Sequence, residues 1–225
     1  MTSQPVTYAV SDGVAVITLS RPEARNAIDS TLAAGLIDAF TRAESAPEVG
    51  AIVVTGADPA FCAGVDLKEF TRLQRPPARA SEAIVMAGKL TKPALGAING
   101  PVMTGGLELA LGLDLLIASE RARFADTHAA VGILPGGGMT ARLPRAVGAR
   151  MAMEMSYTGR VIDAAIMART APWAASTRRS STSAAQATRS TGSVLSATAA
   201  SACSGLGQIP VIASRSSDIR SAKYR

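Results

Sequence analysis

Apolar and polar positions alternate along most of the chain in patterns that predict strands and helices in succession. Residues 14–19 form a short β-branched run before a Ser-Arg-Pro turn, as expected of a strand. Asp29 or Ser30 can cap a helix, and the apolar residues that follow recur at helical spacing up to Phe40, which predicts a helix there. The same reasoning predicts strands at 51–55, 93–98 and 114–118, and helices from Leu67 and at 106–113, 139–145 and 150–157. This alternation predicts an α/β domain.

The pattern is lost after Ala165. Of the 60 residues in 166–225, 32 are Ser, Ala or Thr, and large apolar side chains are few. Such a segment can bury little apolar surface. We therefore expect a core of residues 1–165, followed by a low-complexity, largely disordered tail of residues 166–225.

The net charge of +6 belongs to the tail alone. Residues 1–165 carry 15 basic and 16 acidic side chains, whereas residues 166–225 carry 8 basic residues and one acid. The basic character therefore gives no reason to expect a nucleic-acid partner for the core.

Other classes of site are excluded by residue types and motifs. One histidine and two cysteines are too few for a Cys/His zinc site or a disulfide framework, so we expect no metal. No GxGxxG, GxxxxGK[ST] or GxSxG motif is present, which argues against a nucleotide enzyme and a serine hydrolase. The polar N-terminus and the lack of an apolar run of about 18 residues predict a cytoplasmic protein without membrane contact.

Two small-residue loops, each placed between a predicted strand and a predicted helix, could carry chemistry. In residues 99–110, Gly105 and Gly106 allow close approach of a ligand to amides at a helix N-terminus, and Glu108 follows in the first turn. The loop at residues 60–68 has the same character. Two such loops can each supply one amide to a carbonyl oxygen, as an oxyanion hole requires. The alternative is a glycine-rich turn in which Glu108 is a solvated helix cap.

A resemblance to the enoyl-CoA hydratase/isomerase (crotonase) family is carried by two segments, FCAGVDLKEF and INGPVMTGGLELALGLDLLIAS. Their order and the gap between them fit the family. So do the surrounding segments SRPEARNAID, RFADTHAAVGILPGGGMTARLPRAVG and AMEMSYTGRVIDAA. The resemblance covers residue 6 to about residue 165.

The resemblance implies a spiral of ββα units, commonly assembled as a homotrimer or hexamer. It implies an acyl-CoA substrate, with coenzyme A as part of that substrate and no separate cofactor. The backbone amides of Val65 and Gly105 would form the oxyanion hole, and Glu108 would be one catalytic acid–base residue. The implied CoA-binding residues are Arg25, Asn26, Ala27, Cys62, Ala63, Gly64 and Lys68.

The sequence departs from the family at the second catalytic glutamate, whose position is occupied by His128. A neutral imidazole can exchange a proton near neutral pH, so His128 is a candidate catalytic residue, although a lone histidine is often structural. Asp126 is a second candidate for the missing acid. Hydration, isomerisation and other enolate reactions all stay open.

Two functional hypotheses follow. The first is an acyl-CoA enzyme of the hydratase/isomerase type that stabilises a thioester enolate in the oxyanion hole. The second is a non-catalytic or inactive CoA-binding protein, disabled because the family's C-terminal helices are not recognisable after residue 165. The Ala, Ser, Arg and Thr content of the tail suggests an out-of-frame reading of GC-rich DNA, and a genuine disordered extension is the alternative.

Overall fold

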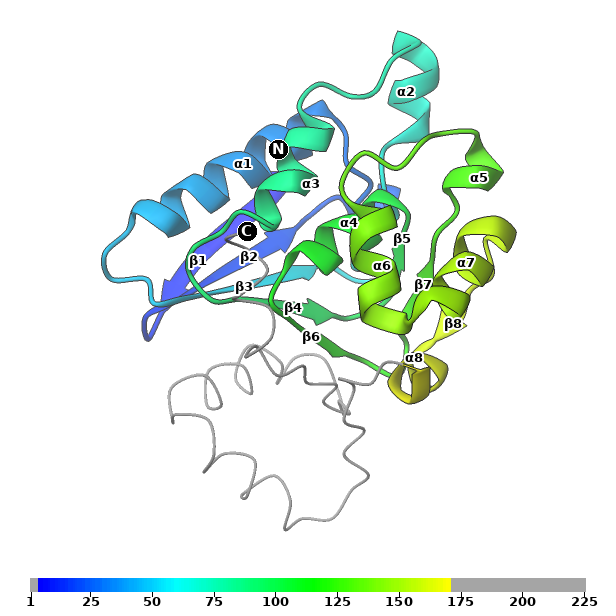
Figure 1. Cartoon of the computed structure of the whole chain (residues 1–225). Helices are drawn as coiled ribbons and strands as arrows, with labels where there is room; N and C mark the ends of the chain where they lie inside the picture. Colours follow the sequence, from blue (N-terminus) through cyan, green and yellow to red (C-terminus); the bar gives the residue numbers. More distant parts are fainter. Residues whose placement is uncertain (1–3, 171–225) are drawn as a thin grey trace.

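The computed structural model describes residues 4–170, which form two β-sheets covered by helices (Figure 1). The larger sheet has the strand order β1 (Val6–Ser11), β2 (Val14–Leu19), β3 (Ala51–Gly56), β4 (Ala94–Ile98) and β6 (Leu115–Ala118). Only the β1–β2 pair is antiparallel within this sheet. The smaller sheet contains β5 (Pro101–Met103), β7 (Arg123–Ala125) and β8 (Ile162–Asp163).

The central strands of the larger sheet are buried because their residues are almost all apolar. All five residues of β4 and five of the six residues of β3 are buried. Continuous apolar runs are typical of parallel strands that are covered on both faces. The main core lies between this sheet and three helices, α1 (Ser30–Ser45), α3 (Ala80–Ala87) and α4 (Gly105–Gly112).

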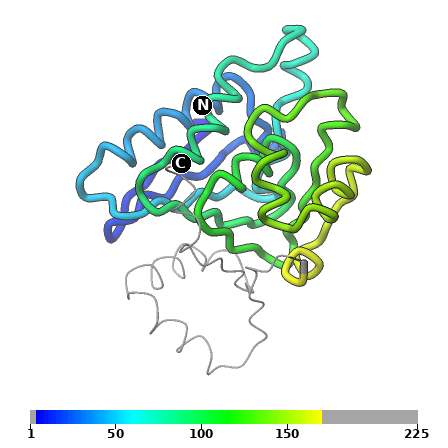
Figure 2. Tube along the Cα trace, in the orientation of Figure 1, coloured from blue at the N-terminus to red at the C-terminus, as the bar shows by residue number. Residues whose placement is uncertain are grey.

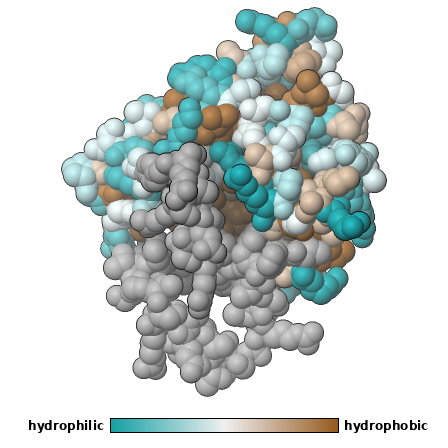
Figure 3. Space-filling view, in the orientation of Figure 1, coloured by the Kyte–Doolittle hydropathy of each residue, from teal (hydrophilic) through white to brown (hydrophobic). Residues whose placement is uncertain are grey.

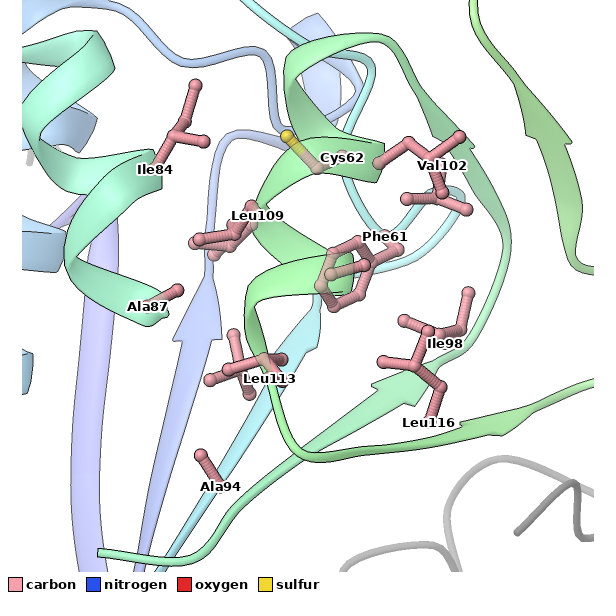
Figure 4. Packing of buried hydrophobic residues seen from close by; sticks show 14 of the residues in the cluster. Phe61, Cys62, Ile84, Ala87, Ala94, Ile98, Val102, Leu109, Leu113 and Leu116 are labelled. Carbon is pink, nitrogen blue, oxygen red and sulfur yellow. The ribbon is translucent and has the colours of Figure 1, made fainter. Parts of the chain in front are cut away.

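Helix α4 lies in the middle of this core. In Figure 4, Ile84 and Ala87 of α3 lie on one side of α4, and Ile98, Val102 and Leu116 lie on the other. Apolar contact on both sides fixes the direction of the helix axis. The N-terminus of α4 consequently has a defined position next to β5.

The remaining helices lie around this core. They are α2 (Leu67–Leu73), α5 (His128–Val131), α6 (Met139–Val147), α7 (Ala149–Thr158) and α8 (Ala164–Thr170), with a 3₁₀ turn at Pro22–Ala24. Figure 2 shows that the segment containing α5 to α8 gathers at one side of the molecule. On the face seen in Figure 3, hydrophobic residues over the helices form small groups among hydrophilic ones. Within residues 4–170, no helix is long and apolar enough to cross a membrane.

The predicted α/β class and the elements predicted from periodicity are confirmed, with ends that differ by a few residues. The prediction lacked β1, α3, α5, α8 and the short strands β5, β7 and β8. Strands of two or three residues carry too little periodicity to be recognised, because their pairing partners are distant in sequence. Helix α8 continues past the predicted boundary at Ala165 as far as Thr170. The rest of the predicted tail, including Cys203 and most of the segment in the out-of-frame hypothesis, lies outside the described residues.

Candidate active site

The two glycine-rich loops are joined by backbone hydrogen bonds. The Cys62 N–H donates to the Pro101 carbonyl at 3.2 Å, and the Met103 N–H donates to the Cys62 carbonyl at 3.0 Å. A Cβ atom on Gly106 would lie 2.4 Å from the Cys62 carbonyl oxygen, so only glycine fits where the loop meets helix α4. The structure therefore brings the two predicted loops together.

This contact places the Val65 and Gly105 amides side by side. A Cβ on Gly105 would lie 3.5 Å from the Val65 nitrogen, and a Cβ on Gly64 would lie 3.3 Å from the Gly105 nitrogen. Val65 is held because its neighbours Gly64 and Asp66 both form backbone hydrogen bonds with Ile28, at 2.7 and 3.0 Å. Among the hydrogen bonds of residues 4–170, none has either amide as its donor. The pair is therefore free to donate to an acceptor placed between the loops.

Thr104, which precedes the Gly105 amide, has an unusual backbone conformation. Its φ of 50° and ψ of −114° are rare for a β-branched residue. Its N–H donates to the Ala125 carbonyl at 2.9 Å, and its hydroxyl bonds to that of Thr127. Backbone strain of this kind costs on the order of 1–3 kcal/mol and persists where surrounding contacts impose it. The two bonds fix the start of α4 to the end of β7.

Glu108 is buried and oriented by backbone donors. Only 2% of the residue is exposed, and its Oε1 accepts from the Gly137 N–H at 2.7 Å and the Met139 N–H at 3.0 Å. Arg142 holds the same loop by donating to the Gly137 carbonyl at 2.8 Å. Burial lowers the pKa of the Arg142 guanidinium, an effect that the nearby Glu108 carboxylate opposes. The alternative in which Glu108 is a solvated helix cap is therefore wrong.

The structure brings His128 to Glu108 across 20 residues of sequence. The imidazole Nε2 of His128 lies 3.7 Å from Glu108 Oε2, and 5% of His128 is exposed. The other ring nitrogen, Nδ1, lies 2.6 Å from Oδ1 of Asp126. Asp126 therefore lies behind His128, on the far side of the ring from Glu108. The arrangement can hold or transfer a proton next to the two free amides.

The two segments predicted to bind CoA also lie together. The Ala63 N–H donates to the Arg25 carbonyl at 3.0 Å, and the bridge between Ile28 and Val65 continues the contact. Arg25 and Lys68 are exposed, so both charged groups can reach a ligand.

Two residues in these segments have side chains with structural partners. The Asn26 carboxamide is fully buried and donates to the Ala57 and Ala60 carbonyls at 2.8 and 2.7 Å. Its oxygen accepts from the Arg21 N–H at 2.9 Å. The Cys62 thiol is also fully buried, and burial raises its pKa to about 12. The side chains of Asn26 and Cys62 therefore hold the two segments in place and are not available to a ligand, whereas Ala63 is partly exposed.

Sequence reasoning missed several residues that hold the site. Asp66 accepts from the amides of Lys68 and Glu69 and from the Arg21 guanidinium. Burial raises the pKa of Asp66, but these bonds outweigh it and lower the pKa overall. An Asp one residue before a helix is a recognisable capping signal. Thr104, Gly137 and Ser156 gave no such signal, because their partners are distant in sequence.

Metal ligation has no candidate in the described part of the chain, where no cluster of three or more His, Cys, Asp or Glu side chains is suited to an ion. The groups described at this site are the two amides, the Glu108 carboxylate and the His128 imidazole. Glu108 lies in the first turn of α4, which begins at Gly105, and His128 is the neighbour of Glu108.

Comparisons with known proteins agree with this geometry. The family model described as enoyl-CoA hydratase/isomerase matches residues 9–170. The Mycobacterium tuberculosis protein named "Probable enoyl-CoA hydratase echA8" is 38% identical over 168 residues, which are 73% of this chain and 65% of that protein. The mitochondrial enoyl-CoA hydratase of Pongo abelii is 44% identical over 158 residues, which are 67% of this chain and 53% of that protein.

Solved structures show the same fold. The crystal structure of enoyl-CoA hydratase from Mycobacterium tuberculosis H37Rv superposes with a TM-score of 0.66 and 44% identity, covering 74% of this chain and 72% of that one. The enoyl-CoA hydratase structure from Bacillus anthracis gives a TM-score of 0.70 at 32% identity, covering 75% and 68%. The crotonase fold predicted from the two loops is confirmed. The chain nevertheless spans less than two thirds of the length of the two sequence relatives above.

Proposed function

Because the chain belongs to the enoyl-CoA hydratase/isomerase family, we propose that it binds an enoyl-CoA thioester and catalyses addition of water to the double bond. One observation carries this proposal. The buried Glu108 carboxylate and the His128 imidazole lie 3.7 Å apart, one helical turn from the Gly105 amide. A water molecule that bonds to both groups would be held beside the bound thioester.

The Val65 and Gly105 amides are proposed to bind the thioester carbonyl oxygen. Polarisation of the carbonyl makes the β-carbon electrophilic and stabilises the negative charge that reaches the oxygen in the enolate. Loss of one such donor in an enzyme costs on the order of 10²–10³ in rate. The anchored conformation of Thr104 supports this role, since it fixes the Gly105 amide before substrate arrives.

Glu108 and His128 are proposed to handle the protons. The water oxygen bonds to the β-carbon while one water proton passes to this pair, and the electrons of the double bond move into the enolate. A proton from the pair then goes to the α-carbon and the carbonyl re-forms, so that one water supplies both the hydroxyl group and the hydrogen. Acid–base catalysis of this kind contributes about 10²–10⁴-fold.

The CoA moiety is proposed to lie along the paired segments around residues 25–27 and 62–64. Arg25 and Lys68 have exposed cationic groups that suit phosphate. The partly exposed Ala63 would contact the remainder, and the buried Asn26 and Cys62 would hold these segments in place. Assembly as a homotrimer or hexamer and a cytoplasmic location stay predictions, and sedimentation would measure the first.

A second candidate is a non-catalytic CoA-binding protein. The observation in its favour is that the chain spans only 65% of its mycobacterial relative and 53% of the mitochondrial one. The relatives' remaining segments have no counterpart in the matched region.

Turnover of crotonyl-CoA separates the two candidates. Hydration removes the absorbance of the conjugated enoyl thioester, and we expect this loss with the native chain but not with Glu108→Gln. Glu82→Gln is the matched control, because Glu82 is exposed on α3 and forms a surface ion pair with Arg79. CoA-ester binding without turnover would support the second candidate. Conversion of a β,γ-enoyl-CoA into the conjugated ester, without hydration, would show that the reaction is isomerisation and not the proposed hydration.

A further inference from the structure

Resting on the proposed role of His128, we propose that Asp126 is a positioning residue that fixes His128 as the Nδ1–H tautomer, with Nε2 directed at Glu108. Asp126 does not face the space between the loops. It acts through the imidazole, from the side opposite Glu108. In this proposal Glu108, His128 and Asp126 act together, and the imidazole supported by Asp126 stands where the family has a second glutamate.

The Asp126 carboxylate is held on both oxygens. Its Oδ1 lies 2.6 Å from Nδ1 of His128 and accepts the His128 backbone N–H at 3.3 Å. Its Oδ2 accepts the Ser156 hydroxyl at 2.6 Å, and 2% of the residue is exposed. A carboxylate with partners on both oxygens cannot rotate away from the ring without losing one of them.

This geometry selects the tautomer. An ionised carboxylate offers only acceptors, so the 2.6 Å contact with Oδ1 requires the proton on Nδ1. The neutral ring then presents a lone pair at Nε2, because the tautomer is set by the bond that the other nitrogen makes. Nε2 and Glu108 Oε2 are then two acceptors 3.7 Å apart. A water molecule can donate one proton to each, which leaves its own lone pair for the β-carbon.

The fold holds Asp126 close to Thr104, the residue that precedes the Gly105 amide. Asp126 directly follows β7, whose last residue, Ala125, pairs with Met103 of β5. The Ala125 carbonyl also accepts the Thr104 N–H. Helix α7 contributes Ser156 from the other side, 30 positions along the chain. Strand pairing therefore sets the distance between the proton-transfer groups and the two free amides.

The tautomer can be measured directly, because His128 is the sole histidine of the 225-residue sequence. The chain would be labelled with ¹⁵N-histidine, freed of any affinity tag, and its imidazole nitrogens observed by two-bond ¹H–¹⁵N correlation. We expect Nδ1 protonated and Nε2 unprotonated in the native chain. Predominant Nε2–H in the native chain would overturn the proposal, whatever the variants do.

Asp126→Ala tests the cause. Alanine leaves Nδ1 without its carboxylate acceptor, so the Nδ1–H tautomer loses its stabilising bond and we expect Nε2–H to appear in this variant. Asp38→Ala is the control, because Asp38 is exposed on α1. Retention of the native tautomer in folded Asp126→Ala would overturn the proposal. Ser156→Ala leaves the Asp126–His128 contact in place. We therefore expect it to populate the Nε2–H tautomer less than the Asp126 variant does.

Kinetics separate this proposal from the proposed function. In an active chain we expect Asp126→Ala to lower kcat by at least about 10-fold with little change in KM, as for groups that orient a catalytic imidazole. An increase confined to KM would count against a positioning role. A native chain without turnover would contradict the proposed hydration, whereas the tautomer measurement would still decide the role of Asp126.

Discussion

Gly137 donates its N–H to Oε1 of Glu108 at 2.7 Å and, at the same time, leaves no room for a side chain of its own. A Cβ at this position would lie 2.8 Å from Glu108 Oε2 and 2.3 Å from Cγ2 of Ile84. Both distances are far below van der Waals contact, so an added methyl group must displace the loop or the carboxylate.

We therefore predict that Gly137→Ala lowers kcat/KM for crotonyl-CoA by about 100-fold, because the displaced amide no longer orients Glu108. Overpacking should also lower the free energy of unfolding by about 1–3 kcal/mol. Gly136→Ala is the matched control, since a Cβ there meets only the Ser81 hydroxyl at 3.8 Å. Equal effects of the two substitutions would show that the Gly137–Glu108 contact is unimportant.

Asn26 and Arg25 are neighbours with different expected roles. Asn26→Ala removes three hydrogen bonds, and the Arg21 N–H and the part-buried Ala57 carbonyl lose these partners. We therefore predict a loss of about 3 kcal/mol in the free energy of unfolding. Arg25→Ala should change stability by less than about 0.5 kcal/mol. If Arg25 binds a phosphate of CoA, the same variant should raise KM by about 10-fold. Chemical denaturation and steady-state kinetics measure the two effects separately.

The Cys62 thiol makes stability fall at alkaline pH. The unfolded thiol ionises near its ordinary pKa of 9.0, whereas burial raises the pKa of the folded thiol to about 12. The contribution of the protonated Cys62 thiol to the free energy of unfolding is therefore complete below pH 9.0. It is lost as pH rises toward 12, at up to about 1.4 kcal/mol per pH unit.

Cys203→Ser isolates this effect by leaving Cys62 as the single thiol. We predict that this thiol resists iodoacetamide at pH 8 in the folded chain and reacts rapidly in denaturant. Fast alkylation under native conditions would contradict the burial of Cys62.

Asp66 makes stability fall at acid pH. Burial raises its pKa, but the hydrogen bonds from the Glu69 amide and the Arg21 guanidinium outweigh burial and lower the pKa below 3.8. The contribution of the ionised Asp66 carboxylate to the free energy of unfolding is therefore present above pH 3.8. It is lost as pH falls through the lowered pKa. We predict that Asp66→Ala costs about 1–2 kcal/mol at pH 7 and that part of this difference disappears under acid.

Asp38→Ala provides the comparison for Asp66, because Asp38 forms an exposed ion pair with Arg42 at 3.7 Å. Exposed pairs contribute little, so its effect should stay below about 0.5 kcal/mol at every pH. A larger effect of Asp38→Ala than of Asp66→Ala would contradict the assignment of Asp66 as the cap that holds the loop after Val65.

The α/β class, most long elements and the two glycine-containing loops could be predicted from the amino-acid pattern alone. Periodicity of apolar residues records which face of an element is buried, and this information is local. The positions of Gly105 and Gly106 before a helix likewise follow from nearby residues. The candidate roles of Glu108 and His128 came from resemblance of the surrounding motifs rather than from their own spacing.

The contacts between polar groups, in contrast, became known from the folded chain. Nε2 of His128 lies 3.7 Å from Glu108, and Asp126 contacts the other ring nitrogen. Ser156 donates to Asp126, and the Asn26 carboxamide donates to backbone carbonyls inside the domain. These contacts join residues up to 34 positions apart, and those of Asp126 depend on the pairing of β5 with β7 and on the packing of α7. Such contacts are set by the balance of burial and hydrogen bonding over the whole domain, which no local pattern in the chain records.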